Sequence, residues 1–218
     1  PLACGTEASW KRLIAGESGI ERITRFDVSD LASKIAAHVP RTGDGDDAGA
    51  GDRFDADAWV PPKERRRMDD FILFGHAAAQ IAVEDAGWKP DDEENRERTG
   101  ILIGSGIGGL PEIERSALQV AKNARRLTPF FIPASLINLV SGQVAIKYGF
   151  TGPNSAVTTA CASGAHAIGD AARIIMLDDA DVMLAGGAEA AICRLGIAGF
   201  AQARALSTGF NDTPERAS

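Results

Sequence analysis

Apolar residues fall into two kinds of run along this chain, and the two kinds alternate. Short runs that are apolar at nearly every position, Gly100–Gly104 and Ala180–Ala185, predict strands buried on both faces of a sheet. Longer stretches with apolar residues three or four apart predict helices, at Glu7–Ala15, Asp69–Asp85, Pro111–Ala124, Ala134–Tyr148 and from Cys161 to about Leu177. Strands of this kind alternating with helices predict a layered α/β fold with a largely parallel central sheet.

Between these elements the pattern is weaker. It predicts an extended segment at Ile20–Phe26, a short strand within Ser33–Val39, a charged loop at Asp91–Arg98 and an extended segment around the two prolines of Thr128–Pro133. The stretch Gly43–Asp57 is rich in Gly and Asp and predicts an exposed loop. A calcium loop is the alternative, but the stretch has neither the spacing nor the closing glutamate of an EF-hand.

Composition excludes several classes of protein. The 218 residues carry a formal net charge of -7, which argues against a general nucleic-acid binder. The three cysteines lie far apart and form no CxxC pair, so we expect a reducing cytoplasm rather than a disulfide scaffold. No run approaches the roughly 18 apolar residues of a membrane span, and none resembles a signal peptide. Because the chain starts at a proline, we expect it to be a piece of a longer protein.

One cysteine stands where chemistry is expected. Cys161 follows the β-prone run Ser155–Thr159 and precedes the predicted helix, among small residues. Unpaired N–H groups and the macrodipole at a helix N-terminus favour negative charge, and so the reactive thiolate. Small neighbours would let a substrate carbonyl approach the sulfur and reach backbone donors. The alternative is a buried structural cysteine, and this stretch alone does not decide between the two.

Two further patterns suggest anion binding. The basic cluster Pro61–Met68 is unusual in an acidic protein, and four cations at the start of a helix oppose the dipole, which favours an anionic partner over a merely solvated surface. The turn Ser105–Gly109 follows a buried strand, as phosphate-binding turns do. It lacks both the GxGxxG pattern and the Walker lysine, so we interpret it as a turn that packs closely against its neighbours.

Taken together, these residues resemble a known family. The segment Thr159-Ala160-Cys161-Ala162-Ser163-Gly164 is similar to the active-site motif of the β-ketoacyl-[acyl carrier protein] synthases, most closely those of type II fatty-acid elongation. Five other landmarks agree in order and spacing: Gly104–Gly109, Pro129–Pro133, Tyr148-Gly149 with Gly152-Pro153, Ala185–Glu189 and Ala203–Ser207. The resemblance covers essentially the whole chain, and the segment Gly43–Asp57 looks like an insertion.

The resemblance implies a thiolase-like αβαβα fold, of which residues 1–218 would form the N-terminal half, without the first strand and the whole C-terminal half. It implies that Cys161 is the nucleophile, taking an acyl group that then condenses with malonyl-acyl carrier protein. The Cys161 N–H would be one of two oxyanion donors. Because the family's two catalytic histidines and its lysine belong to the other half, we expect this chain alone to be inactive, and we interpret His38, His76 and His166 as structural.

The resemblance also implies binding sites and partners. Ile107 and Phe200 match residues that line the acyl pocket, and Phe131 matches one near the dimer contact, although plain core packing is an alternative for each. The expected docking residues for acyl carrier protein are basic: Lys63, Arg66, Arg67, Arg125, Arg126 and Arg204. No cofactor is implied beyond the phosphopantetheine that carries the substrates, and no metal. The full-length protein would be a homodimer that binds neither nucleic acid nor membrane.

Three related functions remain as alternatives. A ketosynthase of a polyketide synthase would share the nucleophile and most landmarks. A chain-length-factor-like subunit would be non-catalytic, but such subunits usually lack the cysteine. A thiolase or an initiating synthase would use coenzyme A, and its cysteine has different neighbours from those of Cys161.

Overall fold

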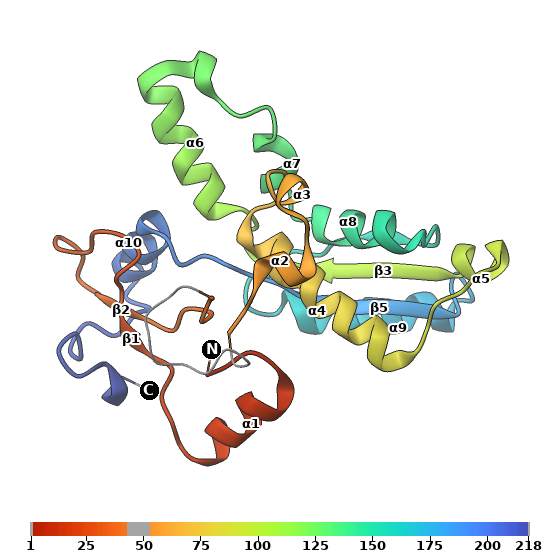
Figure 1. The fold of residues 1–218 in the computed structure, drawn as a ribbon, viewed down its shortest axis with the longest axis horizontal. Helices are drawn as coiled ribbons and strands as arrows, with labels where there is room; N and C mark the ends of the chain where they lie inside the picture. The colour runs from red at the N-terminus through yellow and green to blue at the C-terminus, as the bar shows by residue number, and fades with distance from the viewer. Residues whose placement is uncertain (1, 43–52, 218) are drawn as a thin grey trace. The chain divides into compact units, whose positions relative to one another are not determined.

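A computed structural model describes residues 2–42 and 53–217, and the described chain forms two compact units (Figure 1). The larger unit comprises Trp59–Ala191. The smaller unit comprises the described residues up to Ala58 together with those from Ile192 onward. None of the described helices is both long and apolar enough to cross a membrane.

The larger unit is built on a parallel sheet of three strands, in the order β4-β3-β5. The central strand β3 (Thr99–Gly104) is buried along its whole length, as the sequence predicts. It pairs in parallel with β4 (Asn154–Ser155) through two residues and with β5 (Val182–Gly187) through six. The predicted parallel sheet is therefore confirmed, although β5 is half-buried rather than fully buried.

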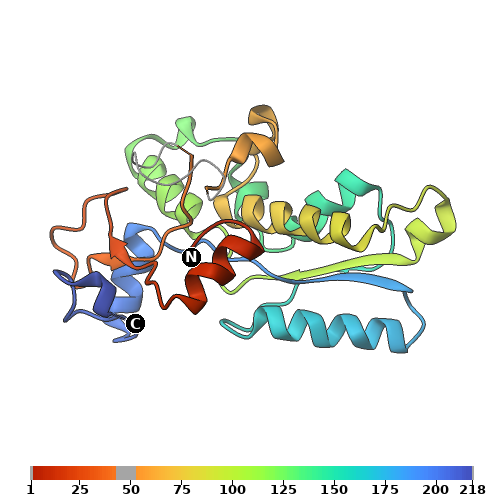
Figure 2. The same ribbon diagram turned by 60° about the horizontal axis from the view of Figure 1, so that its bottom comes forward.

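Helices cover both faces of this sheet. Helices α4 (Asp70–Ala86) and α8 (Leu139–Tyr148) lie on one face and α9 (Ser163–Met176) on the other (Figure 2). The main core lies between α4, α8 and β3, where Phe71, Ile72, Ile101, Val140 and Val144 are at most 1% exposed. Burial of these apolar side chains is the main driving force for the layered arrangement.

Helix α9 approaches the sheet through glycine. A Cβ atom on Gly187, at the end of β5, would lie 2.9 Å from the Cα of Gly164 in the first turn of α9. The opposite face of the helix is open among the described residues, with Ile168 59% and Met176 83% exposed. The sequence predicts a helix packed on several sides, whereas the described residues cover only one side.

An arginine joins the start of β3 to the loop between α9 and β5. Arg98, just before β3, donates to the carbonyl oxygen of Asp178 at 2.7 Å and forms ion pairs with Asp178 and Asp181 at 2.5 and 2.7 Å. Both aspartates lie between α9 and β5. The bonds to one guanidinium thus fix the loop that returns the chain from the helix to the sheet.

The smaller unit is mostly irregular. It contains α1 (Thr6–Ile14), the antiparallel strands β1 (Glu21–Arg22) and β2 (Ile35–Ala36), α10 (Arg194–Gln202) and the 3₁₀ turn η3 (Pro214–Arg216). Ile23, Val28 and Ile197 form its core. Arg194 donates to the Asp27 carbonyl oxygen at 2.7 Å and pairs with Asp30 at 2.5 Å, which joins the two parts of the chain that make up this unit.

Several predicted boundaries are wrong. Asp91–Arg98 is not a loop, because Asp92 accepts a hydrogen bond from the Asn95 N–H and caps α5 (Glu93–Glu97). The segment Thr128–Pro133 is not extended throughout, because α7 (Phe131–Ser135) begins within it. Pro133 is tolerated there since the first helical N–H groups need no partner within the helix. Consequently the predicted helix Ala134–Tyr148 is two helices, α7 and α8.

The basic cluster also differs from its prediction. Lys63 and Arg65 belong to a separate short helix, α3 (Pro62–Arg65), which follows α2 (Ala56–Trp59). Asp69 is extended and caps α4, so the cluster does not open the long helix and does not oppose its dipole. Of the predicted loop Gly43–Asp57, residues 43–52 lie outside the described residues, and the last two are helical.

We expect a side chain at Gly187 to be costly. Gly187→Ala should lower the free energy of unfolding by about 1–3 kcal/mol, because its Cβ would clash with the backbone of Gly164. The matched control is Gly169→Ala, within α9 and with no atom within 4 Å of the added Cβ. That variant should raise stability by roughly 0.5–1 kcal/mol, since alanine favours the helix. Urea unfolding would measure both, and equal effects would contradict the close approach.

A buried carboxyl group predicts a pH dependence of stability. Burial raises the pKa of Asp69 to about 7, with Asp70 adding to the rise and Arg115 opposing it. The Asp69 side chain also accepts the N–H of Glu112, which is itself buried. Between about pH 4 and pH 7 the folded chain therefore holds a proton that the unfolded chain has released, so stability falls as pH rises through this window.

Asp69→Asn should remove this decline, which amounts to at most about 4 kcal/mol, while keeping an oxygen that caps α4. The control is Asp92→Asn at the cap of α5, where hydrogen bonds from Asn95 lower the pKa of the carboxyl group and no titration falls in the window. Denaturant unfolding at a series of pH values would measure both variants. A wild-type curve parallel to that of Asp69→Asn would contradict the assignment.

Candidate active site

The turns that follow the three parallel strands meet at one edge of the sheet. The Ser105 N–H donates to the Val157 carbonyl oxygen at 3.3 Å, and the Ala188 N–H donates to the Gly104 carbonyl oxygen at 3.0 Å. The segments after β4, β3 and β5 are thus held together. Ligands of open α/β sheets bind outside the carboxyl ends of the strands, so this edge is the candidate site.

Cys161 stands on a sharp turn at this edge. Ala160 has a φ of 51°, a left-handed conformation that costs an L-residue about 1–2 kcal/mol. The buried Ser163 hydroxyl stabilises the turn, accepting the Thr159 N–H at 2.9 Å and donating to the Ala160 carbonyl oxygen at 2.7 Å. The result is an exposed thiol immediately before the first turn of α9. In the described chain Cys161 is thus exposed, unlike the buried Cys193.

His166 has a partner on the same turn. Its Nδ1 lies 2.6 Å from the Thr159 Oγ1, and its side chain is exposed. The other two histidines, His38 and His76, are buried, and His76 Nδ1 lies 2.8 Å from Gln80 Nε2. Burial, with a smaller contribution from Lys147, lowers the pKa of His76.

Of the predicted pocket residues, Ile107 lies at this edge. It is 38% exposed, in the turn after β3. This turn passes close to the sharp turn that carries Cys161, because a Cβ on Gly106 would lie 3.3 Å from the Ala160 carbonyl oxygen. The structure therefore brings Ile107 and Cys161 to the same edge. It also agrees with a closely packed glycine turn, as the sequence predicts for Ser105–Gly109.

One acidic side chain at this edge was not singled out from the sequence. Glu189, two residues after β5, accepts the N–H groups of Gly106 and Ile107 on one carboxylate oxygen, at 2.8 and 3.0 Å. Its other oxygen is 3.3 Å from the Ser105 hydroxyl. The sequence signals are its position after a buried strand and two glycines and its place at the end of the landmark Ala185–Glu189, and neither gives a partner.

The predicted docking residues of the larger unit are exposed. Lys63 lies in α3, Arg66 and Arg67 follow it, and Arg125 and Arg126 form the turn η2 (Ala124–Arg126) after α6 (Leu110–Asn123). The Arg67 guanidinium lies over the Phe130 ring, 5.4 Å from its centroid. This contact holds the segment that follows η2 against the segment that follows α3. Phe131, next to it, is half-buried at the start of α7.

The other two predicted residues belong to the smaller unit. Phe200 lies in α10 and is 41% exposed. Arg204 is exposed just after α10, with a φ of 57°. The role of Phe200 in the acyl pocket and the role of Arg204 in docking stay predictions.

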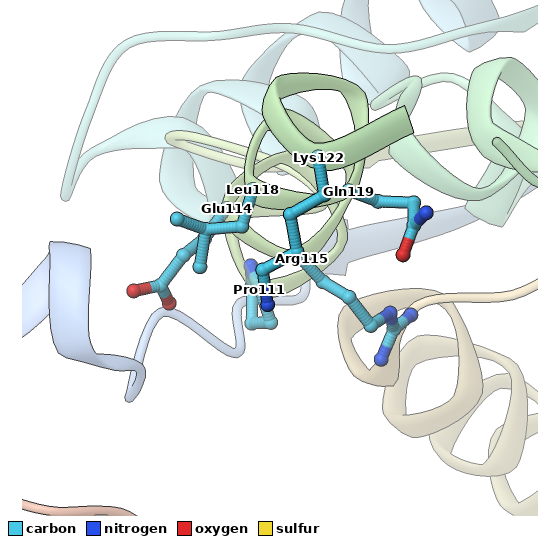
Figure 3. Close-up of a pocket in the computed structure, with 6 residues that line it drawn as sticks. All are labelled: Pro111, Glu114, Arg115, Leu118, Gln119 and Lys122. Carbon is cyan, nitrogen blue, oxygen red and sulfur yellow. The ribbon is translucent and has the colours of Figure 1, made fainter. Parts of the chain in front are cut away.

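A separate groove runs along α6 (Figure 3). It is lined by Pro111, Glu114, Arg115, Leu118, Gln119 and Lys122, which all belong to this helix. None of them comes from the strand ends, so we do not assign the acyl pocket to this groove. In the part of the chain that the structure describes, no three His, Cys, Asp or Glu side chains are grouped so as to hold a metal ion.

Comparison with known proteins decides the family. Residues 1–218 match the family model described as "Beta-ketoacyl synthase, N-terminal domain". The chain belongs to the β-ketoacyl synthase family. It is 54% identical to 3-oxoacyl-[acyl-carrier-protein] synthase 2 of Rhizobium meliloti over 219 residues, which is 100% of this chain and 51% of that protein. The chain thus spans about half the length of the curated relatives it matches.

Solved ketosynthase structures confirm the predicted thiolase-like α/β fold. A β-ketoacyl synthase from Burkholderia phymatum superposes with a TM-score of 0.75 at 27% identity, covering 96% of this chain and 48% of that one. A type II polyketide ketosynthase, solved in complex with its acyl-carrier protein, superposes with a TM-score of 0.63 at 27% identity, covering 67% of this chain and 42% of that one.

The three thiols should differ in reactivity. Cys161 is exposed, Cys4 is partly buried, and Cys193 is buried with its sulfur accepting the Gly196 N–H at 3.4 Å. We expect iodoacetamide to modify Cys161 at least about tenfold faster than Cys193, since alkylation requires an accessible thiolate. Mass spectrometry of digested protein would measure this, with urea-unfolded protein as the control for equal access. Equal rates in the folded protein would contradict the assignment of Cys161.

Proposed function

We propose that this chain is the nucleophile-bearing half of a β-ketoacyl-[acyl carrier protein] synthase of fatty-acid elongation. The observation that carries the proposal is the exposed Cys161, on a strained turn that follows β4 and comes just before the N-terminus of α9. An accessible sulfur in this position suits attack on a carbonyl carbon, because neighbouring N–H groups can stabilise the oxyanion that forms. The 54% identity to a relative named for this activity supports the substrate class.

The reaction begins with transfer of the acyl group. The Cys161 thiolate attacks the thioester carbonyl of the acyl-carrier protein, with the Cys161 N–H as one of two oxyanion donors. The carbonyl re-forms, the bond to the phosphopantetheine sulfur breaks, and that sulfur takes up a proton as it leaves. Malonyl-carrier protein then loses CO₂, and its carbanion attacks the acyl-cysteine to release the β-ketoacyl product. No cofactor is required beyond the phosphopantetheine arms of the substrates.

The groups for the second step are proposed to come from a second half of the protein. Two facts support this: the chain spans about half of its relatives, and α9 exposes Ile168, Ile175 and Met176 on the face away from its sheet. We propose that the second half covers this face and supplies two histidines and a lysine. The isolated chain should then be poorly soluble and unable to condense its substrates.

The carrier protein is proposed to dock on the basic residues. Lys63, Arg66, Arg67, Arg125 and Arg126 are exposed cations on a chain of net charge -7, and Arg204 is exposed in the smaller unit. A related ketosynthase was solved with its carrier protein, which supports the same class of partner. We also propose that the full-length protein is a homodimer, with Ile107 and Phe200 lining the acyl pocket and Phe131 near the dimer contact.

Two alternatives are less well supported. A polyketide ketosynthase shares the fold, but curated relatives at 54%, 47% and 44% identity are named 3-oxoacyl-[acyl-carrier-protein] synthases. A chain-length-factor-like subunit would not need the exposed Cys161. The three cysteines lie far apart in the sequence and form no CxxC pair, which supports a reducing compartment, for which the cytoplasm is the proposed location.

Acyl transfer in the full-length synthase that carries this chain tests both the nucleophile and the docking surface. Mass spectrometry should find the acyl group on Cys161, whether the donor is acyl-carrier protein or the same acyl group on a small thiol. Arg66→Glu should slow transfer from the carrier protein by about tenfold and leave transfer from the small thiol unchanged. Arg66 is preferable to Arg67, whose reversal would also remove the contact with Phe130.

The matched control is Lys89→Glu, an exposed cation outside the basic cluster. It should not change either rate, and added salt should narrow the difference between wild type and Arg66→Glu. Unmodified Cys161 in the presence of both donors would disprove the proposed function. Equal losses for Arg66→Glu and Lys89→Glu would instead disprove only the docking surface.

A further inference from the structure

Glu189 holds the turn that follows β3. One carboxylate oxygen accepts two successive backbone N–H groups, those of Gly106 and Ile107, at 2.8 and 3.0 Å. The other oxygen accepts from the Ser105 hydroxyl at 3.3 Å, and the Ser105 oxygen accepts the Gly108 N–H at 3.0 Å. Hydrogen bonds to a charged acceptor are stronger than neutral ones, so these bonds fix the turn against the end of β5.

The turn cannot move away from the nucleophile without breaking these bonds. Ser105 is 1% exposed and its N–H is bound to the Val157 carbonyl oxygen, on the segment that leads to Cys161. Gly106 lies so close to its neighbours that a Cβ there would be 2.9 Å from the Glu189 Oε2 and 3.3 Å from the Ala160 carbonyl oxygen. The position of Ile107 relative to the turn that carries Cys161 therefore depends on Glu189.

The same bonds argue against proton transfer by this carboxylate. Both oxygens are directed at donors of the turn, so the group is occupied by the backbone rather than presented to a substrate. Glu189 would therefore affect the reaction through the residue whose position its hydrogen bonds fix. That residue is Ile107, whose N–H is bound directly and whose side chain is 38% exposed.

We propose that Glu189 is a positioning residue that sets the acyl-chain preference, by fixing the turn that carries Ile107 beside Cys161. This inference rests on the proposed function, since it requires that Ile107 lines the acyl pocket. It assigns a specificity role to a residue that forms no part of the nucleophile or of the docking surface.

Three substitutions separate the effect of side-chain length at position 189 from the effect of its charge. Glu189→Gln keeps the length of the side chain and an oxygen that can accept both N–H groups. Glu189→Asp keeps the charge but is one methylene shorter, so it cannot reach both donors in the same geometry. Glu189→Ala removes the acceptor altogether. Each is made in the full-length synthase, and acylation of Cys161 is measured with acyl thioesters of short, medium and long chains.

The expected result is a change of preference and not of thiol chemistry. The ratio of kcat/KM for long chains over short chains should shift by about three- to tenfold in Glu189→Asp and Glu189→Ala, and remain within about twofold of wild type in Glu189→Gln. Alkylation of Cys161 by iodoacetamide, which needs no acyl pocket, should stay unchanged. In an Ile107→Ala background, Glu189→Asp should cause no further shift, because both changes act through the same side chain.

The outcomes that overturn the proposal are distinct. An unchanged chain-length ratio in folded Glu189→Asp overturns it, and so does an equal fall for all chain lengths together with slower alkylation, which is the result of a merely structural role. If Glu189→Ala does not fold, the comparison of the Asp and Gln variants decides. If wild-type protein takes no acyl group from any thioester, the proposed function fails first, and this is visible before any variant is made.

Discussion

The parallel pairing of β3 with both of its neighbours is the constraint on which the candidate site depends. Six residues of β5 and two of β4 pair in parallel with the buried central strand, so the three segments that follow leave the sheet in the same direction. Cys161, the turn with Ile107 and the carboxylate of Glu189 come from three separate parts of the chain, and the Ile107–Glu189 bond alone joins residues 82 positions apart. A change of register would separate them all.

Close backbone contact makes this arrangement possible. Close contacts occur at Gly104, Gly106, Gly164 and Gly187, where an added Cβ would lie 2.6, 2.9, 3.3 and 2.9 Å from the nearest neighbouring atom. The strain of Ala160 is offset by the Ser163 hydroxyl, which is bound on both sides of it. Small residues and one buried hydroxyl thus place the Cys161 sulfur at the surface while the backbone beneath it stays tightly packed.

The sequence predicts the periodic elements well and the capped ones poorly. Strand β3 and helices α1, α4, α6 and α9 follow from the spacing of apolar residues, and the glycine turn follows from its composition. Helices α5 and α7 were missed because a capping aspartate and a proline near a helix start have no apolar period. The resemblance supplied the nucleophile, but Glu189 could not be found, because its partners are backbone groups that only the fold brings near.

The residues at the strand ends divide the structural roles between them. Cys161 is exposed on its own turn. Glu189 instead has its charge surrounded by two N–H groups and a hydroxyl of the intervening turn. The donors of that turn are therefore directed at Glu189, whereas Cys161 stands just before the N-terminus of α9. The same turn carries Ile107, so the bonds that hold it to Glu189 also place a wall of the proposed acyl pocket.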